Sequence, residues 1–305
     1  MEALRSLGLG KGDKVLFPEF ICGDLLSALH PLGLIPVWYP VGYDLKPAAD
    51  TDRWPEAKAV LAVNYFGFAQ KLEPFNEYAK RTGATVIEDN AHGFLSRDVC
   101  GRFLGTRSAL GLFSYRKTLL LGRGAGLFLS RKDLQINRPV QLPFIRSSFP
   151  IEILVRRCLI SIFRTQTISY IVMRIIRQLR KLRGLSEIPL QRFDAEVEIP
   201  GEPNPDLFLI TTLKNNTFKL EIQRRRSLYE RLSIQATLLD LKLVYPELGK
   251  YTVPYGLAVL ADDETKIAQL AANNHLDYFR WPQLPAEVLA RGSKHYSEIY
   301  LINFL

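Results

Sequence analysis

Short apolar runs alternate with segments of helical spacing along the first 130 residues of the chain. The runs at 57–64 and 84–88 are apolar on both faces, which is typical of strands in a parallel sheet with helices on each side. Helical spacing at 24–32 and 72–82 predicts connecting helices. The pattern therefore predicts an α/β fold with a mainly parallel sheet sandwiched by helices, whose strands are 14–18, 35–39, 57–64, 84–88, 110–113 and 125–129.

The pattern changes after residue 149. The segment 149–184 is apolar, arginine-rich and predicted to be helical. One interpretation is a surface helix pair whose arginines are solvated or which packs against a second subunit. The other is an interfacial helix attracted to anionic lipid or to polyphosphate substrates. A proline-rich stretch at 200–205 predicts a linker, followed by a long helix through 214–226. We therefore divide the chain into a large domain, 1–199, carrying 149–184 as a basic helical insertion, and a smaller α+β domain, 200–305.

The net charge of +9 is local rather than general. Between Arg146 and Arg183 there are nine basic residues and one acid, Glu152, so the remainder of the chain is near neutral. A single basic segment without a nucleic-acid fold signature argues against nucleic-acid binding.

Other bulk features indicate a soluble cytoplasmic protein. The N-terminus lacks the basic-then-apolar order of a secretory signal, and no stretch reaches the roughly 20 uncharged residues of a membrane helix. The cysteines are sparse, odd in number and without metal-ligand spacing, so we expect reduced thiols and no metal site at Cys22, Cys100 and Cys158.

Polar side chains follow several of the predicted strands. Because parallel sheets bind ligands at the carboxyl ends of their strands, we expect residues 18–22, 64–65, 89–92 and 114–117 to meet at one site. A carboxylate, an imidazole, a hydroxyl and an amine are contributed by Asp89, His92, Ser114 and Lys117.

This set can hold pyridoxal phosphate (PLP). A carboxylate at the end of a buried strand, Asp89, keeps the pyridine nitrogen protonated. The amine of Lys117 forms a Schiff base with the aldehyde, and the Ser114 hydroxyl could bond the phosphate. Each residue also has a simpler interpretation: Asp89 as a turn former, Lys117 as a solvated charge, His92 as a hydrogen-bonded core histidine and Cys22 as a packing thiol.

The pairs Asp89-x-x-His92 and Ser114-x-x-Lys117 resemble the fold-type I PLP enzymes, and among them the nucleotide-sugar (DegT/DnrJ/StrS) aminotransferase family. Residues 9–18, 33–37, 64–67 and 280–285 follow the order of that family's conserved segments. The resemblance implies that His92 lies near the phenolic oxygen of PLP. It also implies that Cys22 occupies the position of a group over the ring face, with Tyr65 and Phe66 supplying the rest of that wall.

The resemblance further implies a PLP-dependent aminotransferase, active as a homodimer in polysaccharide biosynthesis. Its substrates would be a keto-sugar, nucleotide-linked, and an amino donor such as glutamate. Three departures from the family are expected: its N-terminal phosphate loop would precede Met1, its Gly-Asp pair is Ser108-Ala109 here, and its Gly-x-Asn segment has no match. Loss of the phosphate loop is expected to weaken cofactor binding. It motivates an alternative, a degenerate non-catalytic dimer that binds a sugar nucleotide or a partner protein.

Overall fold

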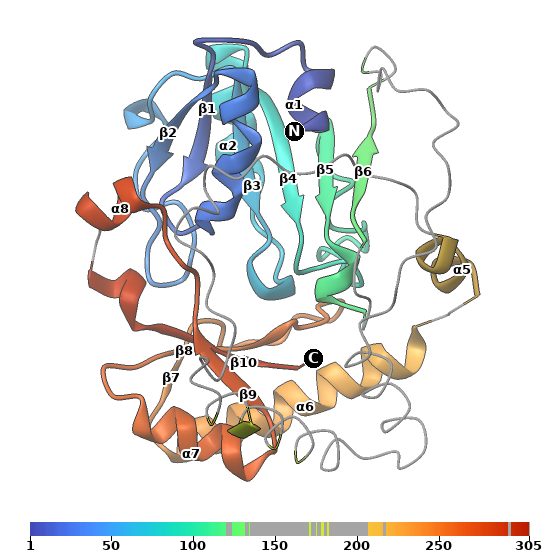
Figure 1. Cartoon of the computed structure of the whole chain (residues 1–305), viewed down its shortest axis with the longest axis vertical. Coiled ribbons are helices and arrows are strands. Elements are labelled where there is room, and N and C mark those ends of the chain that lie inside the picture. The colour runs from blue at the N-terminus through green and yellow to red at the C-terminus, as the bar shows by residue number, and fades with distance from the viewer. Residues whose placement is uncertain are drawn as a thin grey trace.

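The computed structural model describes residues 1–119, 124–131, 134, 171, 175, 178, 179, 182, 207–215, 218–291 and 294–304. Its larger sheet has six strands in the order β2-β1-β3-β4-β5-β6 (Figure 1). Neighbours from β2 to β5 pair in parallel, and only β6 is antiparallel. The predicted α/β class is confirmed, with strands β1 (Lys14–Pro18), β2 (Ile35–Tyr39), β3 (Ala59–Val63), β4 (Thr85–Asn90), β5 (Leu110–Phe113) and β6 (Gly126–Leu129).

Short helices connect these strands. Helix α1 (Glu2–Ser6) opens the chain, and α2 (Glu73–Thr82) packs on β3 and β4, close to its predicted limits. The predicted helix at 24–32 is instead two 3-10 helices, η1 (Gly23–Ala28) and η2 (His30–Leu32). Pro31 lacks an N–H group, and this interrupts a regular α-helix at that point.

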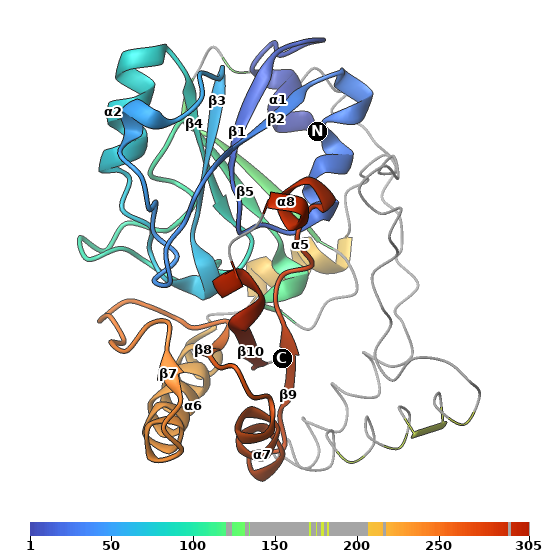
Figure 2. The same ribbon diagram turned by 90° about the vertical axis from the view of Figure 1, so that its left-hand side faces the viewer.

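The smaller sheet is antiparallel, with the order β7-β8-β10-β9. Helices α6 and α7 pack against it, as Figures 1 and 2 show. Its elements are β7 (Lys242–Leu243), β8 (Gly256–Leu260), β9 (Asp277–Arg280), β10 (Ile299–Asn303), α6 (Lys219–Leu238) and α7 (Thr265–Asn273). The long helix expected through 214–226 is divided into α5 (Leu207–Asn215) and α6, with Phe218 in a left-handed conformation at φ 53° just before α6.

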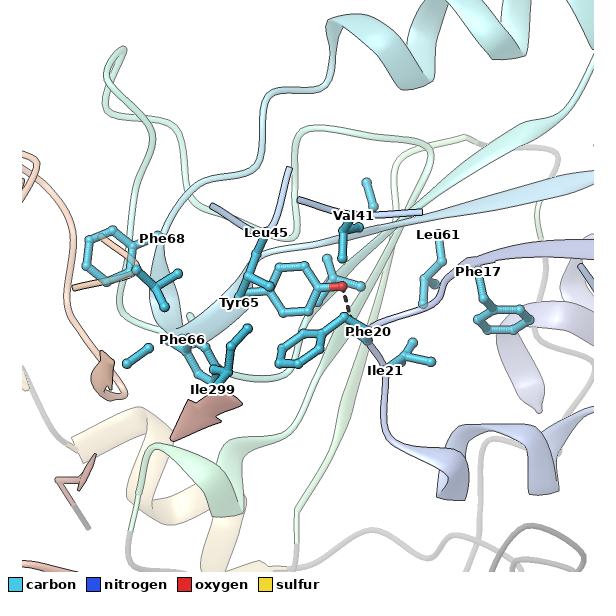
Figure 3. Packing of buried hydrophobic residues seen from close by; sticks show 14 of the residues in the cluster. Phe17, Phe20, Ile21, Val41, Leu45, Leu61, Tyr65, Phe66, Phe68 and Ile299 are labelled. Atoms are coloured by element: carbon cyan, nitrogen blue, oxygen red, sulfur yellow. Dashed lines mark hydrogen bonds between the residues drawn. The ribbon is translucent and has the colours of Figure 1, made fainter. Parts of the chain in front are cut away.

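The segment that leads into β8 is hydrogen-bonded to the loops that follow β3 and β4 of the larger sheet. The Tyr255 N–H donates to the Phe66 carbonyl over 2.8 Å, and the Val253 N–H donates to Ser96 Oγ over 2.9 Å. One hydrophobic cluster runs across both sheets, and Figure 3 shows Ile299 of β10 in it together with the aromatic side chains after β1 and β3. The smaller sheet therefore lies directly beneath the edge where the polar residues gather.

The last part of the chain returns to the larger sheet. After β9 it forms α8 (Ala286–Arg291) and a 3-10 turn, η6 (Lys294–Glu298). Trp38 Nε1 of β2 donates to the Glu287 carboxylate over 3.1 Å, and the Val41 N–H donates to the Tyr296 hydroxyl over 3.1 Å. These bonds fix the segment that leads from β9 against the amino-terminal half of the chain.

The proposed domain boundary at 199/200 lies outside the described residues, as does most of the basic insertion at 149–184. Four described positions of that insertion are exposed apolar side chains, Ile171, Ile175, Leu179 and Leu182. Within the described ranges, no helix combines the length and the hydropathy needed to cross a membrane.

Candidate active site

Asp89 lies at the carboxyl end of β4, between β3 and β5. Its side chain is buried, and one carboxylate oxygen accepts the Ala91 N–H over 2.9 Å. Burial raises the pKa of Asp89, while that hydrogen bond and the charge of Lys117 act in the opposite direction. The carboxylate and the amine are therefore electrostatically coupled at one edge of the sheet.

Lys117 ends the 3-10 turn η5 (Tyr115–Lys117), which follows β5 directly. The turn is closed by the Lys117 N–H, which donates to the Ser114 carbonyl over 3.1 Å. The side-chain amine Nζ lies 3.3 Å from Nε2 of His92. Burial lowers the pKa of Lys117, although attraction to Asp89 opposes this shift. The amine is thus held near an imidazole and a carboxylate, and the shift favours its uncharged form.

The His92 ring is enclosed by aromatic side chains. It stacks on Phe66 and on Tyr255, with centroids 5.6 and 4.7 Å away, and it meets Trp281 edge to face at 5.1 Å. Burial, reinforced by the charge of Lys117, places the pKa of His92 well below its ordinary value, so the ring is neutral. This enclosure fixes both the charge and the plane of the imidazole.

The protonated nitrogen of His92 follows from its hydrogen bonds. The Phe66 N–H donates to Nδ1 over 3.4 Å, so the proton of the neutral ring resides on Nε2. In this tautomer Nε2 carries the hydrogen that faces Lys117 Nζ, and it can donate to the amine when the amine is uncharged. The tautomer and the lowered pKa of Lys117 are mutually consistent.

The turn that presents Phe66 is strained and tightly packed. Phe66 has φ 53°, a left-handed conformation that is uncommon for an aromatic residue. Gly67 follows at φ 90°, and a Cβ there would lie 2.5 Å from the Val253 carbonyl oxygen. Only glycine permits this close approach of the smaller sheet's chain to the residue that sets the His92 tautomer.

The other sequence-predicted residues lie around this pair at different depths. Ser114 is half-buried before η5, and its hydroxyl has no hydrogen-bond partner within the described part of the chain. Cys22 precedes η1 and lies close enough to Lys117 to act on the pKa of that amine, in the raising direction. Tyr65 is buried further back: its hydroxyl donates to the Phe20 carbonyl over 2.7 Å (Figure 3), and its ring packs on Phe20 and Trp281. Tyr65 therefore supports the aromatic wall rather than lying beside Lys117.

Sequence reasoning missed three residues that contact this arrangement. Tyr255 and Trp281 enclose His92, and Arg225 binds the backbone on both sides of it. Trp281 lies in the segment 280–285, which the sequence comparison with the family used only as a marker of segment order and not as part of the site. No local pattern signals Tyr255 or Arg225, because both reach the site from the second half of the chain.

Glu88 faces away from Asp89, as the alternation of a strand requires. It is fully buried and binds Arg107 and the Asn64 side-chain amide. The ion pair with Arg107 lies on the side of β4 opposite to Asp89. Glu88 therefore belongs to the scaffold.

The residues present fit PLP. A buried carboxylate suits the ring nitrogen, an amine of lowered pKa suits the aldehyde, and hydroxyl groups suit the phosphate. Besides Ser114, the buried Thr118 hydroxyl, one residue after Lys117, has no hydrogen-bond partner within the described residues. Those same residues contain no group of three or more histidine, cysteine or acidic side chains that could hold a metal ion.

Solved structures define the class of this fold. The chain superposes over 99% of its length on 3-amino-5-hydroxybenzoic acid synthase, covering 77% of that chain with a TM-score of 0.61 at 17% identity. It superposes equally on GDP-4-keto-6-deoxymannose-3-dehydratase with a trapped PLP-glutamate geminal diamine, covering 81% of that chain with a TM-score of 0.58 at 13% identity. The fold is that of the fold-type I PLP-dependent enzymes.

Sequence comparison finds similarity to one family in the first part of the chain. The DegT/DnrJ/EryC1/StrS aminotransferase family model matches residues 1–141. It is 33% identical over 129 residues to a dTDP-3-amino-3,4,6-trideoxy-alpha-D-glucose transaminase of Micromonospora megalomicea subsp. nigra, a match that spans 39% of this chain and 33% of the relative. Across five curated relatives, the matched stretch spans from 26% to 39% of their own length.

The neutral state of His92 predicts how stability varies with pH. The unfolded chain takes up a proton near the ordinary histidine pKa of 6.5, whereas the folded chain does so only at a much lower pH. This contribution to stability is complete above pH 6.5 and is lost as pH falls below it, by about 1.4 kcal/mol per pH unit. We expect the free energy of unfolding, measured with urea between pH 7.5 and 5, to show this slope in the part of the range below pH 6.5. The pH dependence of the unfolding free energy should be weaker by that amount in His92→Gln. Equal pH dependence in the two proteins would contradict a neutral His92.

Proposed function

We propose that this chain is a PLP-dependent aminotransferase that acts on a nucleotide-linked keto-sugar. The observation that carries the proposal is the placement of the Lys117 amine 3.3 Å from a neutral His92, with the buried Asp89 carboxylate at the adjacent strand end. The family assignment of residues 1–141 supports it.

Asp89, Ser114 and Lys117 would hold PLP. When bound, PLP supplies a protonated pyridine ring that withdraws electrons from the substrate carbon that loses its proton. Asp89 would keep a proton at the ring nitrogen, because an ionised carboxylate in a buried, low-dielectric site stabilises positive charge on its hydrogen-bond partner. The Ser114 and Thr118 hydroxyls are available to the phosphate.

Lys117 would act in two ways. In its uncharged form the amine would hold the cofactor through the aldehyde, since only a free lone pair can bond to a carbonyl carbon. The same amine would also accept and return the proton that the substrate carbon loses. His92, donating from Nε2, would orient this lone pair and then face the ring oxygen.

The finer assignments follow the relatives. One relative is named as a dTDP-amino-sugar transaminase and another, from Vibrio cholerae, as GDP-perosamine synthase. These names support a nucleotide-linked keto-sugar as substrate. The resemblance to the family implies glutamate or a similar amine as donor and a role in polysaccharide biosynthesis. By the same family argument the protein acts as a homodimer.

PLP binding tests the proposal directly. Purified protein titrated with PLP should develop visible absorption, and borohydride reduction should fix the pyridoxyl group on the peptide that contains Lys117. Lys58, at the opposite edge of the sheet, serves as the internal control and should remain unmodified. A colourless protein, or a reduced adduct spread over several lysines, would refute a PLP site at Lys117.

A further inference from the structure

Three consecutive arginines of α6 bind three different segments of backbone. Arg224 Nη2 donates to the Phe304 carbonyl over 2.8 Å, and Arg226 Nη1 donates to the Thr252 carbonyl over 2.6 Å. Arg225 is the fully buried member, with 1% of its surface exposed. Its Nε donates to Glu221 one turn earlier in the same helix, over 2.6 Å, so the charge is balanced inside the protein.

The remaining donors of Arg225 bridge the two halves of the site. Nη2 donates to the Thr118 carbonyl over 2.8 Å, and Nη1 donates to the Pro254 carbonyl over 3.2 Å. Thr118 follows Lys117 directly, and Pro254 precedes Tyr255, whose ring stacks on His92. Each arm of the guanidinium therefore ends one residue away from a group that determines the Lys117–His92 contact.

We propose that Arg225 is a positioning residue of the active site. Its guanidinium joins the turn after β5 to the backbone before β8, and so holds Lys117 Nζ within hydrogen-bond reach of His92 Nε2. Arg225 makes no contact with a reacting group. The inference deepens the proposed function, on which it rests, by adding a residue from the second half of the chain to the machinery around Lys117.

The chemistry of the side chain supports this role. A guanidinium is planar and presents donors in a fixed fork, so it can hold two carbonyls at a set separation. A lysine at the same position retains the charge but has one nitrogen on a flexible stem. It cannot bind the Thr118 and Pro254 carbonyls in the same geometry. Arg225→Lys therefore alters the bridge while retaining the charge beside Glu221.

The pH dependence of Lys117 reactivity reports on this bridge. Burial lowers the pKa of the amine, and a loosened turn hydrates it and moves the pKa back toward its ordinary value. The polar and charged groups that act on the amine are Asp89, His92, Cys22, Asp24 and Arg116. None of them is changed by a substitution at position 225.

The experiment measures acetylation of Lys117 by acetic anhydride as a function of pH, by mass spectrometry of its peptide, in protein without added PLP. The midpoint of the profile depends on protonation, whereas the plateau depends on access. We expect Arg225→Lys to raise the midpoint by about one pH unit, which lowers labelling about tenfold at a pH below both midpoints. Arg224→Lys, which alters the neighbouring arginine and its bonds to Glu221 and to the Phe304 carbonyl, is the matched control. It keeps a positive charge beside Glu221 and should leave the midpoint unchanged.

A second variant keeps the inference falsifiable if stability falls. Glu221→Gln leaves Arg225 in place but removes its charge partner, and it should shift the midpoint in the same direction by less. An unchanged Lys117 midpoint in folded Arg225→Lys protein, even with a lower melting temperature, would overturn the inference and leave Arg225 a purely structural residue. Because the labelling needs no cofactor, a failure of PLP to bind would refute the proposed function separately.

Discussion

Lys117→Ala should abolish transamination, lowering kcat by about 10⁴-fold or more with any amino donor and keto-sugar that the wild-type protein accepts. The alanine removes the amine that we propose as the nucleophile and as the group that moves the proton. The cost to folding should be small, because burial desolvates the amine and its removal relieves that cost. Steady-state turnover with glutamate and a panel of nucleotide-linked keto-sugars measures the effect.

Chemical rescue separates a reacting amine from a structural one. Methylamine, added to Lys117→Ala protein, can enter the space left by the side chain and supply a base, so part of the lost rate should return in proportion to its concentration. Lys58→Ala, at the amino end of the sheet with an exposed side chain, is the matched control and should retain full activity. Wild-type turnover in Lys117→Ala protein would remove Lys117 from the mechanism.

The strand ends that form the site could be predicted because their signals are local. Asp89 and Lys117 each stand at or just after an apolar run, and burial on both faces makes such a run a parallel strand. Because neighbouring parallel strands have their carboxyl ends at the same edge of the sheet, the proximity of the two residues follows from the strand prediction alone. The family model matches residues 1–141, the part of the chain in which these local signals occur.

The enclosure of His92 could not be predicted, because it depends on contacts between distant segments. Tyr255 and Trp281 are more than 160 positions away from His92 in the sequence, and Arg225 binds the carbonyl of a residue 107 positions away. A sequence also predicts an exposed arginine by default, because arginine is almost never fully buried unless it is paired. Only the folded chain shows that Glu221 and three carbonyls satisfy it.

Arg107→Met should be the most destabilising of the scaffold substitutions, lowering the free energy of unfolding by about 3–5 kcal/mol. Arg107 and Glu88 form an ion pair in which the side chains are 5% and 0% exposed, with Nη2 2.6 Å from the carboxylate. The arginine also donates to Asn64 Oδ1 over 3.0 Å. Removing it leaves a buried carboxylate that retains only an amide and a backbone N–H. Urea denaturation measures the loss.

An exposed ion pair provides the control. Lys46 lies 2.6 Å from Asp44 with side chains that are 53% and 52% exposed, so Lys46→Met should cost less than about 1 kcal/mol. Adding Glu88→Gln to Arg107→Met should restore part of the lost stability, because the second change removes the uncompensated charge. If the double variant is no more stable than Arg107→Met alone, the penalty comes from lost packing of the arginine stem. In that case the buried charge of Glu88 does not determine the stability of the sheet beneath the site.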